Sequence, residues 1–230
     1  MFTLSVNIDS VYIIQINRFG GVTMDGLVER KKKEIHDRIV AVAGELFNQR
    51  GFENTTMDQI AAEAVVARKT LYNYFPLKEA IADEYVRSKS KDTAQETLEI
   101  LSDLPDTRSR LIAAINNRYD WLELNPELSG IVLMYRMKCM LQEPNHTFEP
   151  SGTQILIMNI LRADQERGKI SSDISIERVF NFIEYMRTAM VLDWLKDHTR
   201  VNLREETVRL VDLVLYGAFG QQEKSRKIIH

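Results

Sequence analysis

Residues 55–75 read TTMDQIAAEAVVARKTLYNYF, and this stretch decides the fold of the chain. Thr55 and Thr56 are favourable N-cap residues for a helix that runs to about Ala64. A tight turn at Val65–Val66 then leads into a second short helix. Two such helices, the second polar on its outward face, are typical of a helix-turn-helix that reads DNA in the major groove.

The second helix has one inward and one outward face. Leu71 and Phe75 are four residues apart, so we expect both to point into a small core with Phe47 and Ile60. Pro76 suits the start of the next helix, where a missing amide hydrogen costs nothing. The polar side chains of the outward face are left to solvent, namely Arg68, Lys69, Thr70, Tyr72 and Asn73.

An amphipathic helix precedes the motif. Apolar residues from Ile35 to Phe47 recur at helical spacing, and Gly51 can take the left-handed position that ends the helix. Four basic residues, Arg30 to Lys33, open this predicted helix and oppose its macrodipole. Contact with a phosphate backbone would offset that cost, and a solvated basic leader is the alternative.

The composition of the 230 residues favours a mainly helical protein with a sizeable core. The hydrophobic fraction is 44%, and the chain holds only 10 Gly and 5 Pro. Cys139 is the only cysteine and cannot form an internal disulfide, which indicates a reduced, cytoplasmic compartment. No stretch reaches the roughly 18 apolar residues that a membrane span needs, so no membrane partner is expected.

No motif in the sequence indicates an enzyme, a metal site or a bound cofactor. There is no Gly-rich phosphate loop and no nucleophile motif. The histidines are scattered without metal-ligand spacing, at His36, His146, His198 and His230. We therefore expect a binding protein rather than an enzyme, with no cofactor and no metal.

The distribution of charge suits DNA binding better than the total charge does. The net charge is −3, whereas affinity for DNA depends on neutralising phosphates. From Met24 to Lys78 the chain has nine Lys or Arg and eight Asp or Glu, a net charge of +1. Residues 79–230 have twenty Lys or Arg and twenty-four Asp or Glu, a net charge of −4. This asymmetry fits a DNA-binding head on an acidic body that repels the duplex.

The first 23 residues, MFTLSVNIDSVYIIQINRFGGVT, do not match the helical pattern that follows. They have neither the basic leading segment nor the small-residue cleavage site of a secretory signal. We interpret Met24 as the natural start and residues 1–23 as an over-called leader. A genuine arm that adds a strand or touches DNA is the alternative.

The rest of the chain predicts long helices with short breaks. We expect a proline-containing loop at 143–151, and helices over residues 78–102, 110–124, 126–140 and 153–167. Two further helices, 177–196 and 203–219, are apolar over more than one stripe. Such helices are either deeply buried or shared between subunits, so a four-helix dimer interface and burial within one bundle are both compatible with the pattern.

Residues 33–93 closely resemble the DNA-binding domain of TetR-type transcriptional regulators. The residues that carry the resemblance occur together: Thr55-Thr56, Leu71-Tyr72, Phe75, Lys78-Glu79-Ala80, and Gly51-Phe52 at the end of the preceding helix. The segment QERGKI, residues 165–170, also fits the family. Each motif alone is weak, and their combination is specific.

The resemblance implies an all-α homodimer in which a three-helix helix-turn-helix head is joined to a helical body that binds an effector. The dimer would form through helices 177–196 and 203–219. The implied function is that of a ligand-responsive repressor, which binds a palindromic double-stranded DNA operator and is released by a small-molecule effector. The chain then divides into an N-terminal extension (1–28), the DNA-binding domain (29–93, motif about 56–75), the ligand-binding and dimerisation domain (94–222) and a tail (223–230).

Carried over by position, the resemblance implies two groups of DNA-contacting residues. Thr56, Tyr72 and Lys78 would hold phosphates, which positions the head without reading sequence. A contact from Arg or Lys to guanine would contribute about 1–3 kcal/mol of discrimination. The residues that would face the major groove are Arg68, Lys69, Thr70, Asn73 and Tyr74.

Candidates for the effector pocket are the aromatic and methionine side chains of the central helices, residue types that are more often plain core. Arg118, Arg136 and Arg187 interrupt otherwise apolar helices, where they would meet an acidic ligand or form structural pairs. The pocket candidates are Tyr119, Met134, Tyr135, Met137, Met158, Phe182, Tyr185 and Met186.

Two residues of the turn depart from the family pattern. Val65 stands where a glycine is common, and a β-branched residue resists positive φ. Ala67 stands where a serine commonly caps the recognition helix, which forgoes about 1 kcal/mol. We expect a slightly altered turn, or a recognition helix that is ordered only on DNA. An alternative function, a protein-interaction adaptor that has lost sequence-specific DNA binding, rests on these two residues.

Overall fold

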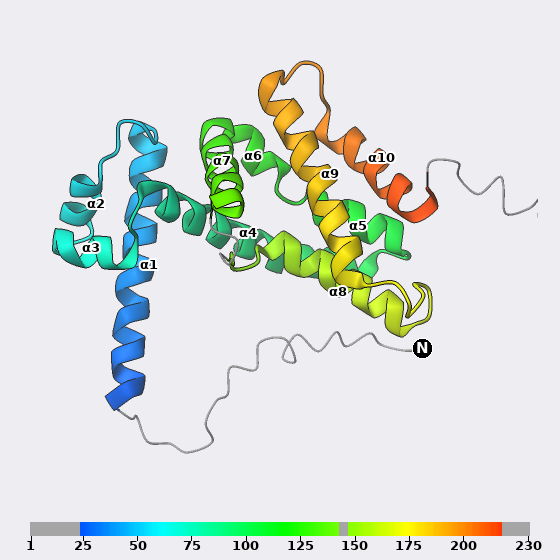
Figure 1. Cartoon of the computed structure of the whole chain (residues 1–230), viewed down its shortest axis with the longest axis horizontal. Coiled ribbons are helices and arrows are strands. Elements are labelled where there is room, and N and C mark those ends of the chain that lie inside the picture. The colour runs from blue at the N-terminus through cyan, green and yellow to red at the C-terminus, as the bar shows by residue number, and fades with distance from the viewer. Residues whose placement is uncertain (1–23, 143–146, 218–230) are drawn as a thin grey trace, which may run out of the picture.

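The computed structural model describes residues 24–142 and 147–217, which form helices joined by turns and loops without any strand (Figure 1). The expected all-α fold is confirmed within these ranges. The interpretations of residues 1–23 and of the tail at 223–230 concern parts of the chain outside them. In chain order the helices are α1 (Met24–Arg50), α2 (Met57–Glu63), α3 (Arg68–Tyr74), α4 (Lys78–Asp103), α5 (Thr107–Asn116), α6 (Tyr119–Leu124), α7 (Pro126–Gln142), α8 (Gly152–Glu166), α9 (Ile176–Lys196) and α10 (Leu203–Tyr216).

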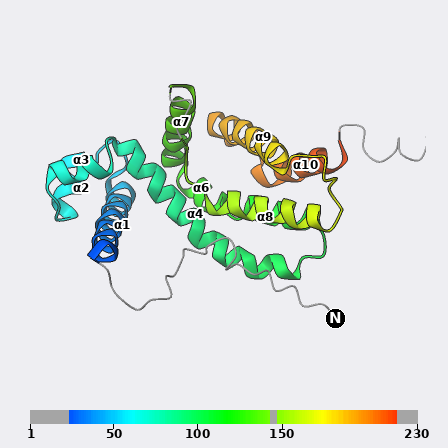
Figure 2. The same ribbon diagram turned by 60° about the horizontal axis from the view of Figure 1, so that its bottom comes forward.

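The head consists of α1, α2 and α3, which lie together at one end of the molecule in both views (Figures 1 and 2). Ile60 and Leu71 are fully buried, and Phe47 and Phe75 are buried beside them. The small core predicted from these four side chains is therefore confirmed. Gly51 has φ +79°, as expected of the left-handed residue that ends α1.

Helix α4 connects the head to the body (Figure 2). Its first turns belong to the head core through Ile81 and Tyr85, and Leu128 and Val132 of α7 join the same cluster. The Nδ2 of Asn48 in α1 donates a hydrogen bond to the Tyr85 hydroxyl at 3.0 Å. The head is thus fixed to the first half of α4, and the expected boundary after residue 93 falls inside a continuous helix.

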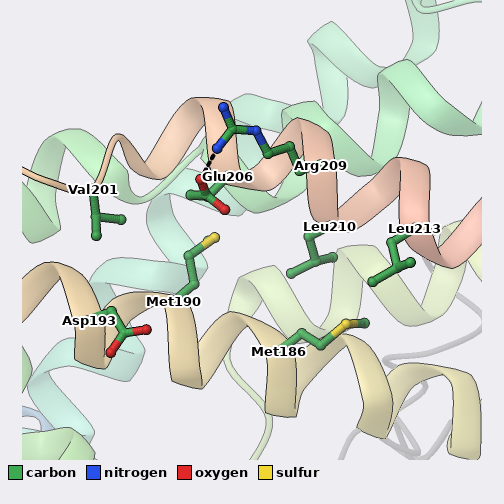
Figure 3. Close-up of a pocket in the computed structure, with 8 residues that line it drawn as sticks. All are labelled: Met186, Met190, Asp193, Val201, Glu206, Arg209, Leu210 and Leu213. Carbon is green, nitrogen blue, oxygen red and sulfur yellow. Dashed lines mark hydrogen bonds and ion pairs between the residues drawn. The ribbon is translucent and has the colours of Figure 1, made fainter. Parts of the chain in front are cut away.

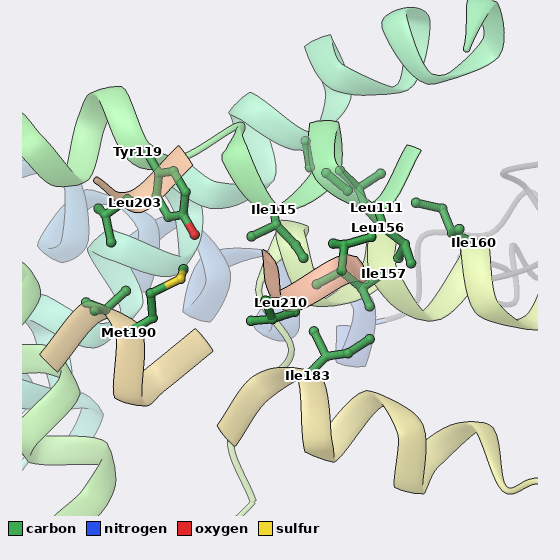
Figure 4. Close-up of a cluster of buried hydrophobic side chains, with 14 of the residues drawn as sticks. Leu111, Ile115, Tyr119, Leu156, Ile157, Ile160, Ile183, Met190, Leu203 and Leu210 are labelled. Carbon is green, nitrogen blue, oxygen red and sulfur yellow. The ribbon is translucent and has the colours of Figure 1, made fainter. Parts of the chain in front are cut away.

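Helices α5 to α10 form the body around a second apolar cluster (Figure 4). Leu111 and Ile115 of α5, Ile157 of α8, Ile183 of α9 and Leu210 of α10 are buried in it. The hydroxyl groups of Tyr119 and Thr207 form a hydrogen bond at 2.8 Å within this core. In the part of the chain that the structure describes, no helix has the length and apolar character required to cross a membrane.

The single helix expected over residues 110–124 was wrong. The structure ends α5 at Asn116 and starts α6 at Tyr119, with Asn117 and Arg118 in the turn between them. The break redirects the chain so that Tyr119 and Leu122 are buried in the body core. Tertiary packing has overridden a continuous helical pattern at this junction.

Candidate nucleic-acid interface

Helix α2 is positioned by a reciprocal cap at its first turn. The backbone amide of Gln59 donates to the Thr56 Oγ1 at 3.2 Å, and the Thr56 amide donates to the Gln59 Oε1 at 2.9 Å. Thr55 is fully buried, and its hydroxyl donates to the carbonyl of Gly51 at 2.9 Å. The hydroxyl hydrogen of Thr56 stays available to a phosphate oxygen, while Thr55 ties α2 to the end of α1.

The turn between α2 and α3 adopts the left-handed geometry despite its side chain. Val65 has φ +53°, and it is the one non-glycine residue with positive φ among those described. The amide of Val66 donates to the carbonyl of Ala61 at 3.0 Å, and the amide of Val65 to that of Ala62 at 3.1 Å. This pair of bonds is the Schellman motif that usually ends in glycine. The departure at Val65 therefore changes the strain of the turn and not its shape.

Replacing the two unusual turn residues is expected to stabilise the head. Val65→Gly should raise the free energy of unfolding by about 1 kcal/mol. The left-handed conformation costs a valine about 1–2 kcal/mol, and glycine avoids this cost. Part of the gain is lost because glycine gives up more conformational entropy on folding. Ala67→Ser should add about 1 kcal/mol, since Ala67 makes no side-chain cap. Thermal unfolding measures both effects, since each kcal/mol of added stability raises the melting temperature by about 2–4 °C. Val66→Gly is the control and should lower the melting temperature. A lower melting temperature for Val65→Gly as well would contradict the claim that Val65 is strained.

The outward face of α3 carries four of the predicted contacts. Arg68, Lys69, Tyr72 and Asn73 are exposed, whereas Leu71 on the opposite side is fully buried. Thr70 is half-buried at the edge of this face. The polar groups are thus held on a helix whose other side is fixed in the head core.

Arg68 is held in place by two neighbours. Its Nε lies 3.1 Å from the Oδ1 of Asp58 in α2, and its guanidinium carbon lies 5.6 Å from the centre of the Tyr72 ring. Because both Arg68 and Asp58 are exposed, this ion pair contributes little to stability. Its effect is to align the guanidinium over Tyr72. The role of Asp58 was missed, because nothing local in the sequence pairs it with Arg68.

Tyr74 lies apart from the other predicted groove contacts. It is half-buried, and its ring centre is 6.4 Å from that of His36 in α1. The structure thus places Tyr74 against α1 and not beside Lys69 and Asn73 on the exposed face of α3.

Lys78 forms hydrogen bonds and an aromatic contact within the head. Its Nζ donates to the carbonyls of Phe52 and Thr55, both at 2.7 Å, and lies 4.1 Å from the centre of the Phe52 ring. An ammonium group has three hydrogens, so one stays available for a phosphate. Lys78 therefore joins the start of α4 to the loop before α2.

The basic segment of α1 does not open that helix, and this expectation was wrong. Helix α1 begins at Met24, so Arg30 to Lys33 lie in its interior, away from the amino end of the macrodipole. Arg30 pairs with Glu34 at 3.4 Å, Lys32 with Glu29 at 2.7 Å, and Lys33 with Asp37 at 2.5 Å. Residues 24–29 hold no proline, and Gly26 is accommodated within the helix.

The structure does not gather the predicted effector residues into one site. Tyr119 is buried in the body core, where burial raises the pKa of its phenol group. Met134, Phe182 and Tyr185 are more than half exposed. Tyr135, Met137 and Met158 are half-buried on α7 and α8. Of the predicted set, Met186 lines a hollow.

That hollow lies between α9 and α10 and has a volume of about 320 Å³ (Figure 3). Its floor is apolar, with Met186 and Met190 from α9 facing Leu210 and Leu213 from α10. Charged side chains stand at its edge, including Glu206 and Arg209, which form an ion pair. The other lining residues are Asp193 and Val201. The hollow thus falls on the two helices through which the resemblance implies that a dimer would form.

Comparison with known families and proteins points to one class of protein. The family model described as "Bacterial regulatory proteins, tetR family" matches residues 39–85, from α1 into α4. The HTH-type transcriptional repressor KstR2 of Rhodococcus jostii (strain RHA1) is 28% identical over 188 residues, which cover 78% of this chain and 88% of that protein. The probable acrEF/envCD operon repressor of Escherichia coli (strain K12) is 24% identical over 217 residues, covering 89% and 96%. These relatives are regulators and not enzymes.

Solved structures show the same fold. The crystal structure of Thermus thermophilus FadR, a TetR family transcriptional repressor in complex with lauroyl-CoA, aligns with a TM-score of 0.62 at 24% identity, over 80% of this chain and 94% of that one. A TetR transcriptional regulator from Rhodococcus sp. RHA1 aligns with a TM-score of 0.60 at 16% identity, over 82% and 99%. Both alignments extend well beyond the head, so the body shares the arrangement too.

Proposed function

Because the chain belongs to the TetR family of DNA-binding transcriptional regulators, we propose that it is a repressor that binds a palindromic operator as a homodimer and is released by a small-molecule effector. The observation that carries the proposal is the outward face of α3. Lys69, Tyr72 and Asn73 are exposed there, while Leu71 fixes the helix in the head core. A helix held in this way can enter the major groove with its polar side chains toward the bases.

The dimer is proposed to form through α9 and α10. Phe182 and Tyr185 on α9 are 57% and 59% exposed, and Leu213 and Tyr216 on α10 are 46% and 43% exposed. Large apolar groups gathered on two neighbouring helices favour a subunit interface. A second copy would cover this face and would hold two α3 helices at a fixed separation.

Release by an effector is proposed to act through α4. This helix is packed against α1 in the head and against α7 and α8 in the body. Two half-sites lie about 34–36 Å apart, one turn of DNA, so both α3 helices bind only when their separation matches. A ligand that prefers another orientation of α4 shifts the population away from this match, and DNA disfavours that ligand to the same extent.

The phosphate contacts are tested by gel shift over a range of salt concentrations. Tyr72→Phe removes one hydroxyl, so we expect binding to operator and to scrambled duplex to weaken alike, by about 2- to 10-fold. Lys78→Ala should reduce the slope of log K against log salt by about 1. Lys138→Ala, which removes an exposed lysine of α7, is the control and should change neither quantity.

Lys78→Ala also removes two hydrogen bonds within the head, so its thermal unfolding is measured beside its DNA binding. An unchanged salt slope in a folded Lys78→Ala protein would contradict the phosphate role. The adaptor alternative predicts a different result for the unmodified protein, namely no salt-sensitive, sequence-selective complex with the intergenic DNA upstream of its own gene.

A further inference from the structure

Five charged side chains from four parts of the fold meet inside the body, outside the DNA-binding face. They are Asp83 of α4, Arg118 of the α5–α6 turn, Arg136 of α7, and Glu184 and Arg187 of α9, and each of the other four influences the pKa of Arg118. Three arginines thus face two carboxylates. Ionised groups are rare in protein interiors unless they are paired, so the surplus cation needs an explanation.

Four of the five groups are paired with each other. Arg187 lies 2.8 Å from Glu184, and Arg136 forms an ion pair with Asp83. The Nε2 of Gln154 in α8 also donates to Glu184 at 2.8 Å. The paired side chains are 12–21% exposed. Their charges are therefore balanced within the body and do not need a ligand.

Arg118 is the surplus cation. Among residues 24–142 and 147–217, no carboxylate forms an ion pair with its guanidinium, whose carbon lies 6.0 Å from the centre of the Trp121 ring. Burial, together with repulsion from Arg187 and Arg136, lowers the pKa of Arg118 to about 9. A half-buried guanidinium in this position destabilises the ligand-free protein.

Two further hydrogen-bond donors of the body lack partners, one of them on the residue next to Arg118. The Nδ2 of Asn117, the residue before Arg118, is buried without an acceptor in the described structure, although its Oδ1 accepts a bond from Thr153 at 3.0 Å. The hydroxyl of Ser129 is buried and unbonded in the same way. Ser129 lies seven residues before Arg136 and so shares its face of α7. Unpaired buried donors of this kind are uncommon and call for an acceptor.

We propose that Arg118, with the amide of Asn117 beside it, binds the single carboxylate of a small amphipathic molecule, and that this molecule is the effector. The inference rests on the proposed ligand-responsive function. One carboxylate matches the surplus of one positive charge, and a planar guanidinium binds a carboxylate through two parallel hydrogen bonds. The adjoining Tyr119 and Leu122 belong to the apolar core of the body, which suits an apolar tail.

The position of the cluster links ligand binding to the head. Asp83 is in the part of α4 whose neighbours Ile81, Ala82 and Tyr85 belong to the head core. A carboxylate at Arg118 competes with Asp83 for Arg136, whose ion pair with Asp83 joins α7 to α4. Binding therefore favours a different arrangement of α4, which is the element that positions α3.

The test compares carboxylates with neutral molecules of the same shape on the full chain without DNA. Hexanoate, dodecanoate and benzoate are titrated calorimetrically against hexanamide, dodecanamide and benzamide. We expect a carboxylate to bind about 10- to 100-fold more tightly than its amide. Arg118→Gln should remove this preference. The affinity of the unmodified protein for the carboxylate should fall as the pH rises past about 9, where Arg118 loses its charge.

Unfolding of the ligand-free variants provides a second readout. Arg118→Gln should raise the melting temperature by about 2–4 °C, because it removes an unpaired, half-buried charge. Arg187→Gln should lower it, because Glu184 loses its partner. Arg162→Gln breaks an exposed pair with Glu177 at 3.5 Å and should change neither stability nor binding.

Three results would overturn the site: no carboxylate binds, amides bind equally well, or Arg118→Gln lowers the melting temperature. A different result would contradict the proposed function. A carboxylate that binds through Arg118 but leaves the operator complex intact supports the site and contradicts the release mechanism.

Discussion

Replacing Gly152 by alanine is expected to destabilise the body by about 3 kcal/mol, which corresponds to a fall of about 6–12 °C in melting temperature. Gly152 is the first residue of α8, and an added Cβ would overlap the backbone carbonyl oxygen of Ser90 in α4. The amide of Thr153 donates to the Ser90 hydroxyl at 3.2 Å in the same contact. Backbone atoms cannot rotate away as a flexible side chain can, so α8 must move from α4.

A second glycine provides the matched control for this substitution. Gly130 lies in α7, where an added Cβ would meet only Leu195, at 3.7 Å or more. Gly130→Ala should therefore be neutral, or should stabilise the protein by about 0.5–1 kcal/mol through its helix propensity. Thermal and urea unfolding of both variants measure the difference. Equal stability of Gly152→Ala and Gly130→Ala would contradict the close approach of α8 to α4.

Introducing charge on the exposed apolar face of α9 is expected to weaken operator binding strongly. The double substitution Phe182→Asp with Tyr185→Asp places two carboxylates at the centre of the proposed interface, where like charges from the second copy would meet them. A monomer binds only one half-site. It therefore loses the second binding event, which is intramolecular in the dimer. The apparent affinity for the operator should fall by about 100-fold or more.

The oligomeric state and DNA binding are measured together in this experiment. Sedimentation velocity should give a dimer for the unmodified protein and a monomer for the double variant. Ile100→Asp, at a 58% exposed position of α4, is the control and should stay dimeric and bind the operator. A double variant that stays dimeric would contradict the interface; a monomer with full operator affinity would contradict the need for two half-sites.

The head could be predicted from the sequence because its signals are local. The N-cap candidates Thr55 and Thr56, of which Thr56 is the cap, and the spacing of Leu71 and Phe75 were enough to place two helices, which the structure finds at Met57–Glu63 and Arg68–Tyr74. The capping box was missed although Thr56 and Gln59 have its spacing, so its signal was present. The left-handed turn at Val65 could not be foreseen, because a valine gives no sign of positive φ.

Contacts between distant residues explain the rest of what the sequence did not reveal. The bonds of Lys78 to Phe52 and Thr55 join residues 26 and 23 positions apart. Asp83 and Arg136, which are 53 positions apart, pair through the packing of α4 on α7. The break at Asn117–Arg118 likewise accompanies the packing of Tyr119 and Leu122 in the body core. No local pattern encodes such partners, because they depend on how the elements come together.

The central claim, that paired α3 helices of a dimer read an operator, is tested most directly by selecting binding sites from a pool of random-sequence duplexes with the full chain. The account predicts enrichment of a two-fold symmetric sequence whose half-site centres are about 10–10.5 base pairs, or a multiple, apart. Asn73→Ala or Lys69→Ala should relax the preference at particular positions of both half-sites. Failure to enrich any sequence, or enrichment of a single site without symmetry, would contradict the account.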